Sequence, residues 1–168
     1  MCGSEAISKI VDELEFLDAE RRQLKANGPH FRIVHRSPQP FAPCSLHEKA
    51  AVFLIHHGQM FQVGLGTTVV KLFDYMARHN RLAQTAREIE NGIRAQREWS
   101  GLGGAALASG ISTRYVRVYA GRIRAALGLA LRNAGLEINP NAVLTSEGTA
   151  LNEVGYRLRG TFEWLHIA

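Results

Sequence analysis

The sequence predicts an α+β fold, and three features of the chain lead to this prediction. Two β-rich runs within residues 50–65 flank His57-Gly58-Gln59, which is typical of a hairpin with glycine in the turn. Several segments carry apolar residues at spacings of three and four, which predicts helices at 5–26, 66–80, 81–96 and 113–127. Short runs with weak alternation follow residue 141 and predict strands to the end of the chain. Helices lying between two strand regions belong to the α+β class.

Length and composition predict a globular protein that does not enter a membrane. The 168 residues are enough for one domain with a real core, or one domain and an appendage. No apolar run approaches the roughly 20 residues that span a bilayer, and the N-terminus lacks the order of a signal peptide. The two cysteines, Cys2 and Cys44, form no disulfide framework and fit a reducing compartment. We therefore expect a cytoplasmic protein.

The first helix, residues 5–26, begins after a capping Ser4 and ends at Asn27-Gly28-Pro29. Its apolar residues follow a three–four alternation over about three heptads, which suits a coiled coil with a second copy of the chain. The alternative is that this helix packs on its own domain. Residues 1–28 are accordingly predicted to be a separate helical region, and the residues expected to make a dimer are Ile7, Ile10, Leu14, Leu17 and Leu24.

Residues 29–48 are predicted to be a proline-rich connector, within which 31–35 is compatible with a short strand. The globular domain is then expected to span residues 49–168. Cys44, His47, His56 and His57 lie close in sequence, but their spacing matches no zinc module. His56 and His57 would point to opposite faces of a strand. We therefore predict surface or partly buried histidines and no metal site.

The middle of the chain predicts two helices and a glycine-rich loop. Gly66 opens the helix that closes at His79-Asn80, and Thr85 with Glu88 forms a capping box for the next one. Gly92 weakens that second helix by about 1 kcal/mol relative to alanine. The loop at 98–111 carries no Gly-Lys-Ser/Thr sequence, so it does not predict a phosphate-binding loop, and no cofactor is expected.

Residues 113–127, TRYVRVYAGRIRAAL, predict a helix with two different faces. One face is apolar and the other carries arginines, with Gly121 between them; the apolar residues are Val116, Tyr119, Ile123 and Leu127, and the arginines are Arg114, Arg117 and Arg124. Such a helix can lie in the major groove of DNA, or it can be an ordinary solvated amphipathic helix. Residues 81–132 contain nine arginines and three acidic residues, which favours a polyanionic partner.

The remaining residues predict a turn at Asn139-Pro140-Asn141 and then short strands that include a hairpin. The order of elements is hairpin, helix, helix, loop, arginine-rich helix and hairpin. This is the order of a winged helix-turn-helix domain preceded by an N-terminal sheet, with the helix at 5–26 in front of it.

Three segments of the chain resemble the C-terminal effector domain of OmpR/PhoB-type response regulators. Residues 114–119, with Ile123, Arg124 and Leu127, are similar to the family's recognition helix, which looks like R-T-V-D-V-H-I-x-x-L-R-x-x-L. Residues 154–158, VGYRL, match the end of the family's wing, and 72–82 resembles its first helix with the following turn. The resemblance covers about residues 51–160 and implies sequence-specific binding to double-stranded DNA and a role in transcription regulation.

The chain departs from the family's pattern at several places. Asn152 and Glu153 stand where the family's wing usually has arginine and glycine, so insertion of this wing into a minor groove is in doubt. Two loops are longer than usual, and we expect no receiver domain because 50 residues cannot hold its sheet. The loop at 98–111 corresponds in position to the family's contact with RNA polymerase, although its sequence differs.

The resemblance implies a role for each arginine. Base contacts are expected from Arg114, Arg117, Gly121 and Arg124, with arginine preferring guanine and Gly121 allowing a close approach. Contacts to phosphates are expected from Arg94, Arg97, Thr113, Arg122, Arg157 and Arg159. Because one copy covers little DNA, a homodimer on repeated or palindromic half-sites is expected.

Two other functions stay open. The same fold suits a replication or partition factor of a mobile element, and a winged helix can also bind an acidic protein partner. An enzyme is not expected, because no triad order, paired carboxylates or cofactor fingerprint stands out in the sequence.

Overall fold

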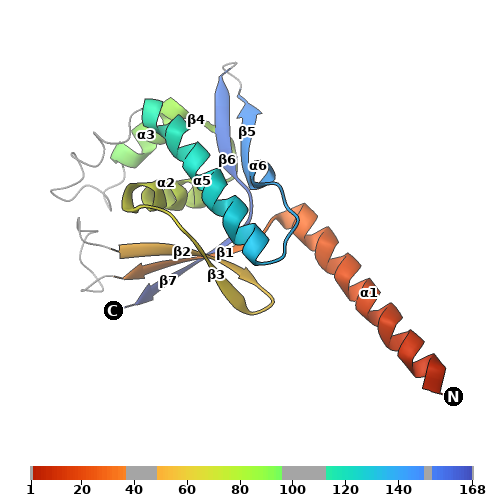
Figure 1. The fold of residues 1–168 in the computed structure, drawn as a ribbon. Coiled ribbons are helices and arrows are strands. Elements are labelled where there is room, and N and C mark those ends of the chain that lie inside the picture. The colour runs from red at the N-terminus through yellow and green to blue at the C-terminus, as the bar shows by residue number, and fades with distance from the viewer. Residues whose placement is uncertain (1, 37–48, 96–112, 150–152, 168) are drawn as a thin grey trace.

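A computed structural model describes residues 2–36, 49–95, 113–149 and 153–167, and over these residues the chain has a mixed α+β fold, as predicted (Figure 1). Two sheets and a group of helices form one body, and a long helix projects from it. The helices are α1 (Cys2–Asn27), α2 (Thr67–Arg78), α3 (Ala86–Ala95), α5 (Thr113–Asn133) and α6 (Pro140–Val143). The strands are β1 (His30–Arg36), β2 (Lys49–His56), β3 (Gln59–Val63), β4 (Gln84–Thr85), β5 (Leu144–Gly148), β6 (Val154–Leu158) and β7 (Thr161–Ile167).

The larger sheet has the strand order β3-β2-β1-β7. Strands β2 and β3 form the predicted antiparallel hairpin, with His57 and Gly58 in its turn at φ values of 50° and 71°. Both residues therefore have the left-handed conformation that two-residue hairpin turns favour. Strand β7 pairs in parallel with β1, from His30 opposite Thr161 to Arg36 opposite Ile167, so the two ends of the domain share one sheet.

Strand β1 corrects the predicted connector at 29–48. Residues 30–36 lie between β2 and β7, in the interior of the larger sheet, and Phe31, Ile33 and His35 point into the core at 2% exposure or less. The physical reason is the alternation of these three residues, which gives the strand one buried face. The folded domain therefore also includes residues 30–36, which the predicted boundary at 49 left out.

The smaller sheet has the strand order β4-β6-β5, and all of its pairs are antiparallel. The predicted C-terminal hairpin corresponds to β5 and β6, whereas the two-residue strand β4 was not predicted. The turn expected at Asn139-Pro140-Asn141 is instead the start of α6. Asn139 caps that helix, because its Oδ1 accepts a hydrogen bond of 2.9 Å from the Asn141 N–H.

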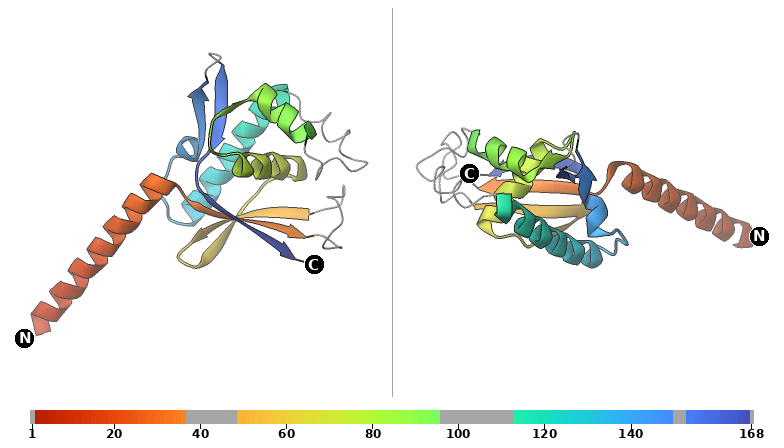
Figure 2. Two further views of the ribbon diagram at one scale, coloured as in Figure 1. Left: turned by 180° about the vertical axis from the view of Figure 1, so that it is seen from behind. Right: turned by 90° about the horizontal axis from the view of Figure 1, so that it is seen from above.

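Helix α2 lies at the centre of the core, and every residue from Val69 to Ala77 is buried. It contacts the larger sheet, α3 and α5, which Figure 2 shows from two further sides. On α5 the predicted apolar face is confirmed, since Val116, Ile123 and Leu127 are buried.

Helix α3 has the predicted capping box. The Thr85 N–H donates to Glu88 Oε2 at 2.7 Å, and the Glu88 N–H donates to Thr85 Oγ1 at 3.2 Å. These reciprocal bonds satisfy two backbone donors that a helix start leaves without partners inside the helix. The capping box is thus confirmed, and α3 begins at Ala86, five residues after the start of the predicted segment 81–96.

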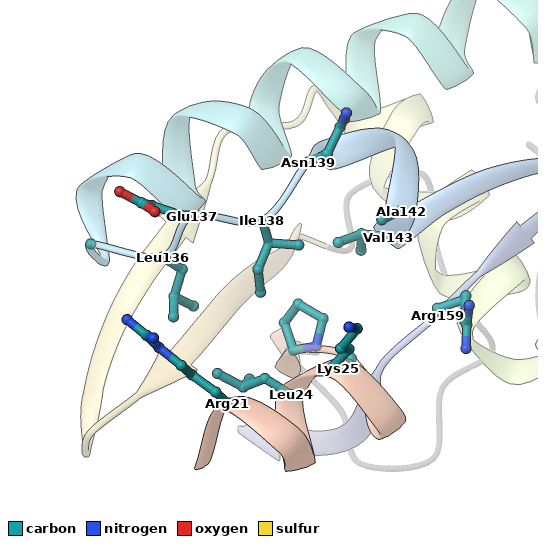
Figure 3. Close-up of a pocket in the computed structure, with 13 residues that line it drawn as sticks. Arg21, Leu24, Lys25, Leu136, Glu137, Ile138, Asn139, Ala142, Val143 and Arg159 are labelled. Carbon is teal, nitrogen blue, oxygen red and sulfur yellow. The ribbon is translucent and has the colours of Figure 1, made fainter. Parts of the chain in front are cut away.

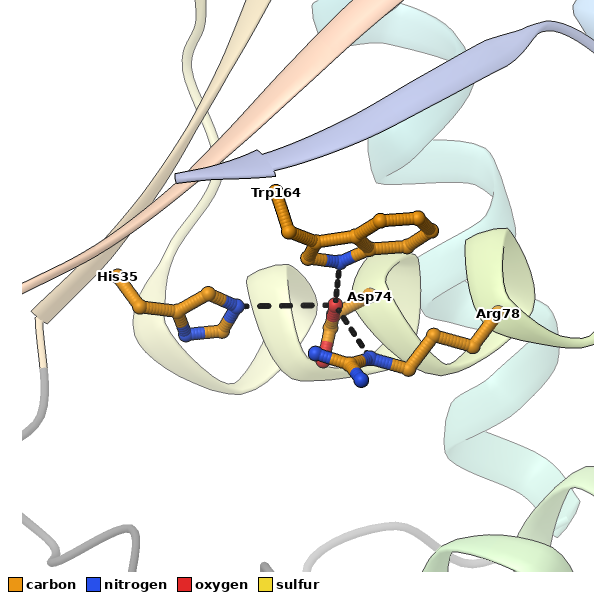
Figure 4. A network of polar contacts seen from close by, with 4 residues as sticks. All are labelled: His35, Asp74, Arg78 and Trp164. Atoms are coloured by element: carbon orange, nitrogen blue, oxygen red, sulfur yellow. Dashed lines mark hydrogen bonds and ion pairs between the residues drawn. The ribbon is translucent and has the colours of Figure 1, made fainter. Parts of the chain in front are cut away.

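Asp74 joins α2 to the larger sheet (Figure 4). Trp164 Nε1 on β7 donates to its Oδ1 at 2.7 Å, Arg78 Nε donates at 3.1 Å, and His35 Nε2 on β1 lies 3.7 Å away. Burial raises the pKa of this carboxyl, but His35, Trp164 and Arg78 together lower it more, so the net pKa lies below its ordinary value. Asp74 is therefore a carboxylate at neutral pH, and it connects two strands and a helix.

Helix α1 ends at Asn27, as predicted, where the Gly28 N–H donates to Leu24 O at 2.8 Å. Gly28 has a φ of 72°, and a Cβ placed there would lie 3.0 Å from Gly160 Cα, so the residue combines a left-handed conformation with close backbone contact. In all views the helix projects away from the body (Figures 1 and 2). None of the helices in the described ranges is both long enough and apolar enough to cross a membrane.

Candidate nucleic-acid interface

The outward face of α5 carries most of the residues predicted to contact DNA bases. Arg114, Arg117 and Gly121 are exposed, and so is Arg122, which was assigned to phosphate. A Cβ added to Gly121 would meet no atom within 4 Å, so nothing in the protein covers the helix backbone there. The same helix is anchored by buried Val116 and Ile123 on its other side. The first turns of α5 therefore present arginines on a rigid support.

Two residues on this face were missed by the sequence reasoning. Tyr115 and Val118 are 47% and 46% exposed, although both are large and apolar. Successive residues of a helix are rotated by roughly 100°, so residues 114, 118 and 122 form one line on its surface. The spacing of four thus indicates that Val118 shares a line with two arginines. The line through Arg114, Arg117 and Arg124 fits a helical spacing as well, and the sequence does not distinguish the two.

Arg124, which was predicted to contact a DNA base, makes hydrogen bonds within the protein. Its Nε donates to Leu144 O at 3.0 Å, and its second terminal nitrogen donates to Ser146 Oγ at 2.6 Å. The guanidinium carbon also lies 5.9 Å from the centre of the Tyr156 ring. The physical reason is that Arg124 faces the hairpin of β5 and β6, whose carbonyl and hydroxyl oxygens satisfy its donors. Arg124 thus connects α5 to this hairpin.

Thr113 is also engaged within the protein. Its N–H and its Oγ1 both donate to Glu90 Oε2, at 3.0 Å and 2.7 Å. A carboxylate at a helix N-terminus satisfies backbone donors and interacts favourably with the helix dipole. Glu90 therefore accepts both donors of Thr113, which was predicted to contact a DNA phosphate, and it connects α3 to α5.

The other predicted phosphate contacts do not form one cluster. Arg157 is half-buried, and its Nε donates to Asn80 O at 2.9 Å. Arg159 is exposed and lines a cavity beside α1, away from the outward face of α5. Arg94 belongs to α3, whereas Arg97 and the loop at 98–111 lie outside the described residues. Among the members of this set whose side chains the structure describes, Arg122 is the one that shares the outward face of α5 with Arg114 and Arg117.

The cavity beside α1 has a volume of about 700 Å³ (Figure 3). Arg21, Leu24 and Lys25 line it from α1, and Arg159 with the segment 135–139 lines it from the domain. Leu24 is half-buried here, in contrast to Ile7, Ile10, Leu14 and Leu17, which are between 46% and 64% exposed. Leu24 therefore belongs to the junction of α1 with the domain, and the exposed stripe predicted to make a dimer consists of the other four residues.

The hairpin of β5 and β6 lies next to α5 and ends in the exposed Glu153 and Val154. The Thr149 N–H donates to Glu153 O at 3.0 Å, which closes this end of the hairpin. Asn152 lies outside the described residues. The acidic side chain of Glu153 is thus exposed near the end of this hairpin.

His56 and His57 differ from their predicted arrangement on opposite faces of a strand. Their rings are stacked, with centroids 3.9 Å apart. The reason is that β2 ends at His56, and the positive φ of His57 turns its side chain back toward its neighbour. Burial lowers the pKa of His56, His57 lowers it further, and Glu20 raises it, with a net decrease.

Comparisons of the chain with protein-family models, with curated proteins and with solved structures found no match. Among the described residues, the strongest candidate for a nucleic-acid interface is the exposed face of α5, made of Arg114, Tyr115, Arg117, Val118 and Arg122.

Proposed function

We propose that the chain is a sequence-specific double-stranded DNA-binding protein that regulates transcription as a dimer. The observation that carries this proposal is the face of α5 on which Arg114, Arg117 and Arg122 are exposed while the opposite side is buried in the core. A major groove about 12 Å wide admits a helix of this kind. In this proposal the protein acts by binding and performs no catalysis.

The arrangement of elements supports a winged helix-turn-helix similar to the effector domain of OmpR/PhoB-type regulators. Helices α2, α3 and α5 pack on one another, and the hairpin of β5 and β6 lies beside α5 in the position of a wing. The larger sheet, formed by β1, β2, β3 and β7, would correspond to the N-terminal sheet of that family. In this assignment α5 is the recognition helix.

Each residue on the outward face of α5 then has a chemical role. Arg114 and Arg117 donate to the O6 and N7 atoms of guanine, which is the commonest specific contact of arginine in the major groove. Val118 contacts the methyl group of a thymine, and Gly121 allows the helix backbone to approach the DNA. Arg122 contacts a phosphate and so positions the helix without reading sequence.

Arg124, Arg157 and Thr113 make hydrogen bonds within the protein, so in this proposal they support the recognition helix and the wing. Arg124 joins the recognition helix to the wing, and Arg157 joins the wing to Asn80. Through these bonds the wing and α5 hold a fixed relative orientation. Base recognition is thereby concentrated in the first turns of α5, as expected of a recognition helix.

The test is binding of the untagged protein to fragmented genomic DNA across a salt series, followed by sequencing of the retained fragments. We expect one short repeated motif to be enriched. Arg117→Ala should weaken binding to that motif by about 5- to 150-fold, corresponding to about 1–3 kcal/mol, and should relax specificity at one position. Arg122→Ala should weaken all sequences alike and reduce the salt slope by about one.

Arg132→Ala is the matched control, because Arg132 is exposed in the last turn of the same helix and lies outside the proposed interface. Its binding should equal that of the wild type. Enrichment near promoters supports transcription regulation, whereas enrichment at a replication origin supports a replication or partition factor with the same fold. Absence of retention even at low salt contradicts DNA binding.

A second function is favoured by the exposed Tyr115 and Val118, which place apolar surface between the arginines. Aromatic residues and arginine are both enriched at protein–protein interfaces. The same face would then bind an acidic protein. Weak binding to DNA with little dependence on salt would support this function, because groove binders lose affinity steeply as salt rises.

A further inference from the structure

Three side chains able to bind a metal ion meet where α1 joins the domain. Glu20 comes from α1, and His56 and His57 come from the end of β2 and the turn that follows it. One ligand atom of each lies within 4.8 Å of the others. Glu20 is far in sequence from the adjacent His56 and His57, so the fold itself brings the carboxylate to the two histidines.

The local conformation brings the donor atoms together. His57 Nε2 lies 2.6 Å from Glu20 Oε1, and the two imidazole rings are stacked with centroids 3.9 Å apart. A positive φ is uncommon for a residue other than glycine, and here it directs His57 toward both of the other residues. Ligands of a tetrahedral zinc ion lie at roughly 2.0–2.2 Å from it and hence roughly 3.3 Å from one another. Small side-chain rotations would bring the three donors to that spacing.

The three residues line one cavity of about 370 Å³, which leaves room for an ion and a water molecule. Gln23, Asn27 and His30 also line this cavity. Glu20 and His56 are half-buried, while His57 is exposed, so the site is open to solvent on one side. An ion can therefore enter without unfolding the junction.

The donor set is suited to a transition metal. Imidazole nitrogens bind zinc, copper and nickel, and two histidines with one glutamate form a known three-residue set that leaves a fourth position for water. Calcium and magnesium prefer oxygen donors, and this site offers one carboxylate.

We propose that Glu20, His56 and His57 bind one divalent transition-metal ion, for which zinc is the natural probe, and that this ion fastens α1 to the hairpin of β2 and β3. The bond between Glu20 and His57 is the contact that the ion would replace. An exposed pair of this kind contributes little stability on its own, so α1 gains a stronger connection when metal is bound. The site does not depend on DNA binding.

The test is a titration of the untagged full-length protein with zinc against a chromogenic chelator. We expect one ion per chain. Glu20→Gln, His56→Gln and His57→Asn should each weaken binding by at least about 100-fold, because even outer-shell partners of metal sites contribute roughly 10- to 100-fold. Asparagine is chosen at 57 because it tolerates a positive φ, so the hairpin keeps its turn.

Glu15→Gln and His166→Gln are the matched controls, since both residues are exposed and lie outside the cavity. They should leave the affinity for zinc unchanged. X-ray absorption of the zinc-loaded protein should show nitrogen and oxygen ligands. Sulfur ligands, or affinity retained in all three site variants, would overturn the assignment and direct attention to the cysteines.

The fastening of α1 is measured by hydrogen–deuterium exchange. Zinc should slow amide exchange in residues 20–27 of the wild type and leave it unchanged in His57→Asn. Zinc binding without this protection would contradict a role in holding α1. No zinc binding at all would mean that Glu20 and His57 form an ordinary hydrogen-bonded pair, and neither result bears on whether α5 binds DNA.

Discussion

At the scale of single residues, buried polar groups connect the parts of the domain. Asp74 is 1% exposed and interacts with His35, Trp164 and Arg78 from two strands and its own helix. Arg124 and Thr113 likewise use their donors inside the protein. Such groups stabilise a fold only while all members are present, because a lone partner left buried has lost its hydration without compensation.

Replacing Asp74 with asparagine should therefore lower the free energy of unfolding at pH 7 by about 2–5 kcal/mol. The folded pKa of Asp74 lies below its ordinary value of 3.8, so its contribution is complete above that value and is lost as pH falls through the folded pKa. When the pH falls from about 4 to 2, the free energy of unfolding should therefore decrease less for Asp74→Asn than for the wild type.

Urea unfolding of both proteins across this pH range checks the prediction. Asp12→Asn, an exposed change on α1, is the control and should follow the wild-type curve. Parallel acid profiles for wild type and Asp74→Asn would mean that the carboxylate does not stabilise the fold.

At the scale of the elements, α3 approaches α2 closely at Gly92. A Cβ at this position would lie 1.9 Å from the Tyr75 hydroxyl oxygen, and Tyr75 is only 3% exposed. Helix propensity alone indicates only that Gly92 destabilises the helix. A glycine is needed at position 92 because α3 packs closely on α2 there, against Tyr75, which lies 17 positions earlier in the chain.

Gly92→Ala should thus destabilise the protein by about 1–2 kcal/mol, since the cost of overpacking exceeds the helix propensity that alanine adds. Gly121→Ala is the matched comparison, because its Cβ would meet open space on the same type of element. That variant should be more stable by up to about 1 kcal/mol and should bind DNA more weakly if the backbone approaches the duplex. Thermal unfolding measures both changes, and equal effects at the two sites would contradict the packing argument.

Local patterns predicted most elements, because periodicity and capping are written within a few residues. The hairpin around His57-Gly58, the capping box of α3 and the apolar face of α5 are examples. Partners from distant segments could not be predicted in this way. The parallel pairing of β1 with β7 and the hydrogen bonds of Arg124 depend on which distant segments meet in the fold. The residue spacing within one segment does not indicate its partner.

At the scale of the whole molecule, the uncovered apolar stripe of α1 is the main feature. Ile7, Ile10, Leu14 and Leu17 are all at least 46% exposed, and the helix projects from the body (Figure 1). The alternative that α1 packs along its own domain is therefore wrong for this part of the helix. A stripe at heptad spacing on a free helix supports pairing with a second copy of the chain.

Leu14→Glu should convert the proposed dimer to a monomer, because each copy would lose a leucine from the helix–helix interface and place a charge there. Burial of one such side chain contributes about 1.5–3 kcal/mol, so two copies correspond to a dissociation constant raised by at least about 100-fold. Sedimentation velocity measures the change, with Asp12→Ala, exposed on the opposite side of the helix, as the control. A wild-type protein that sediments as a monomer would contradict self-pairing, whatever the variant does.

The parallel contact between β1 and β7 has a consequence for the kinetics of folding. Partners in this pair, such as His30 and Thr161, are joined by nearly the whole length of the domain. The loop-closure entropy of such a contact is large, and topologies rich in distant pairings reach the native state more slowly than helical bundles of similar stability. During synthesis, β1 can pair with β2 early, but its pairing with β7 must wait until β7 has emerged, whereas α1 needs no later residue to become helical.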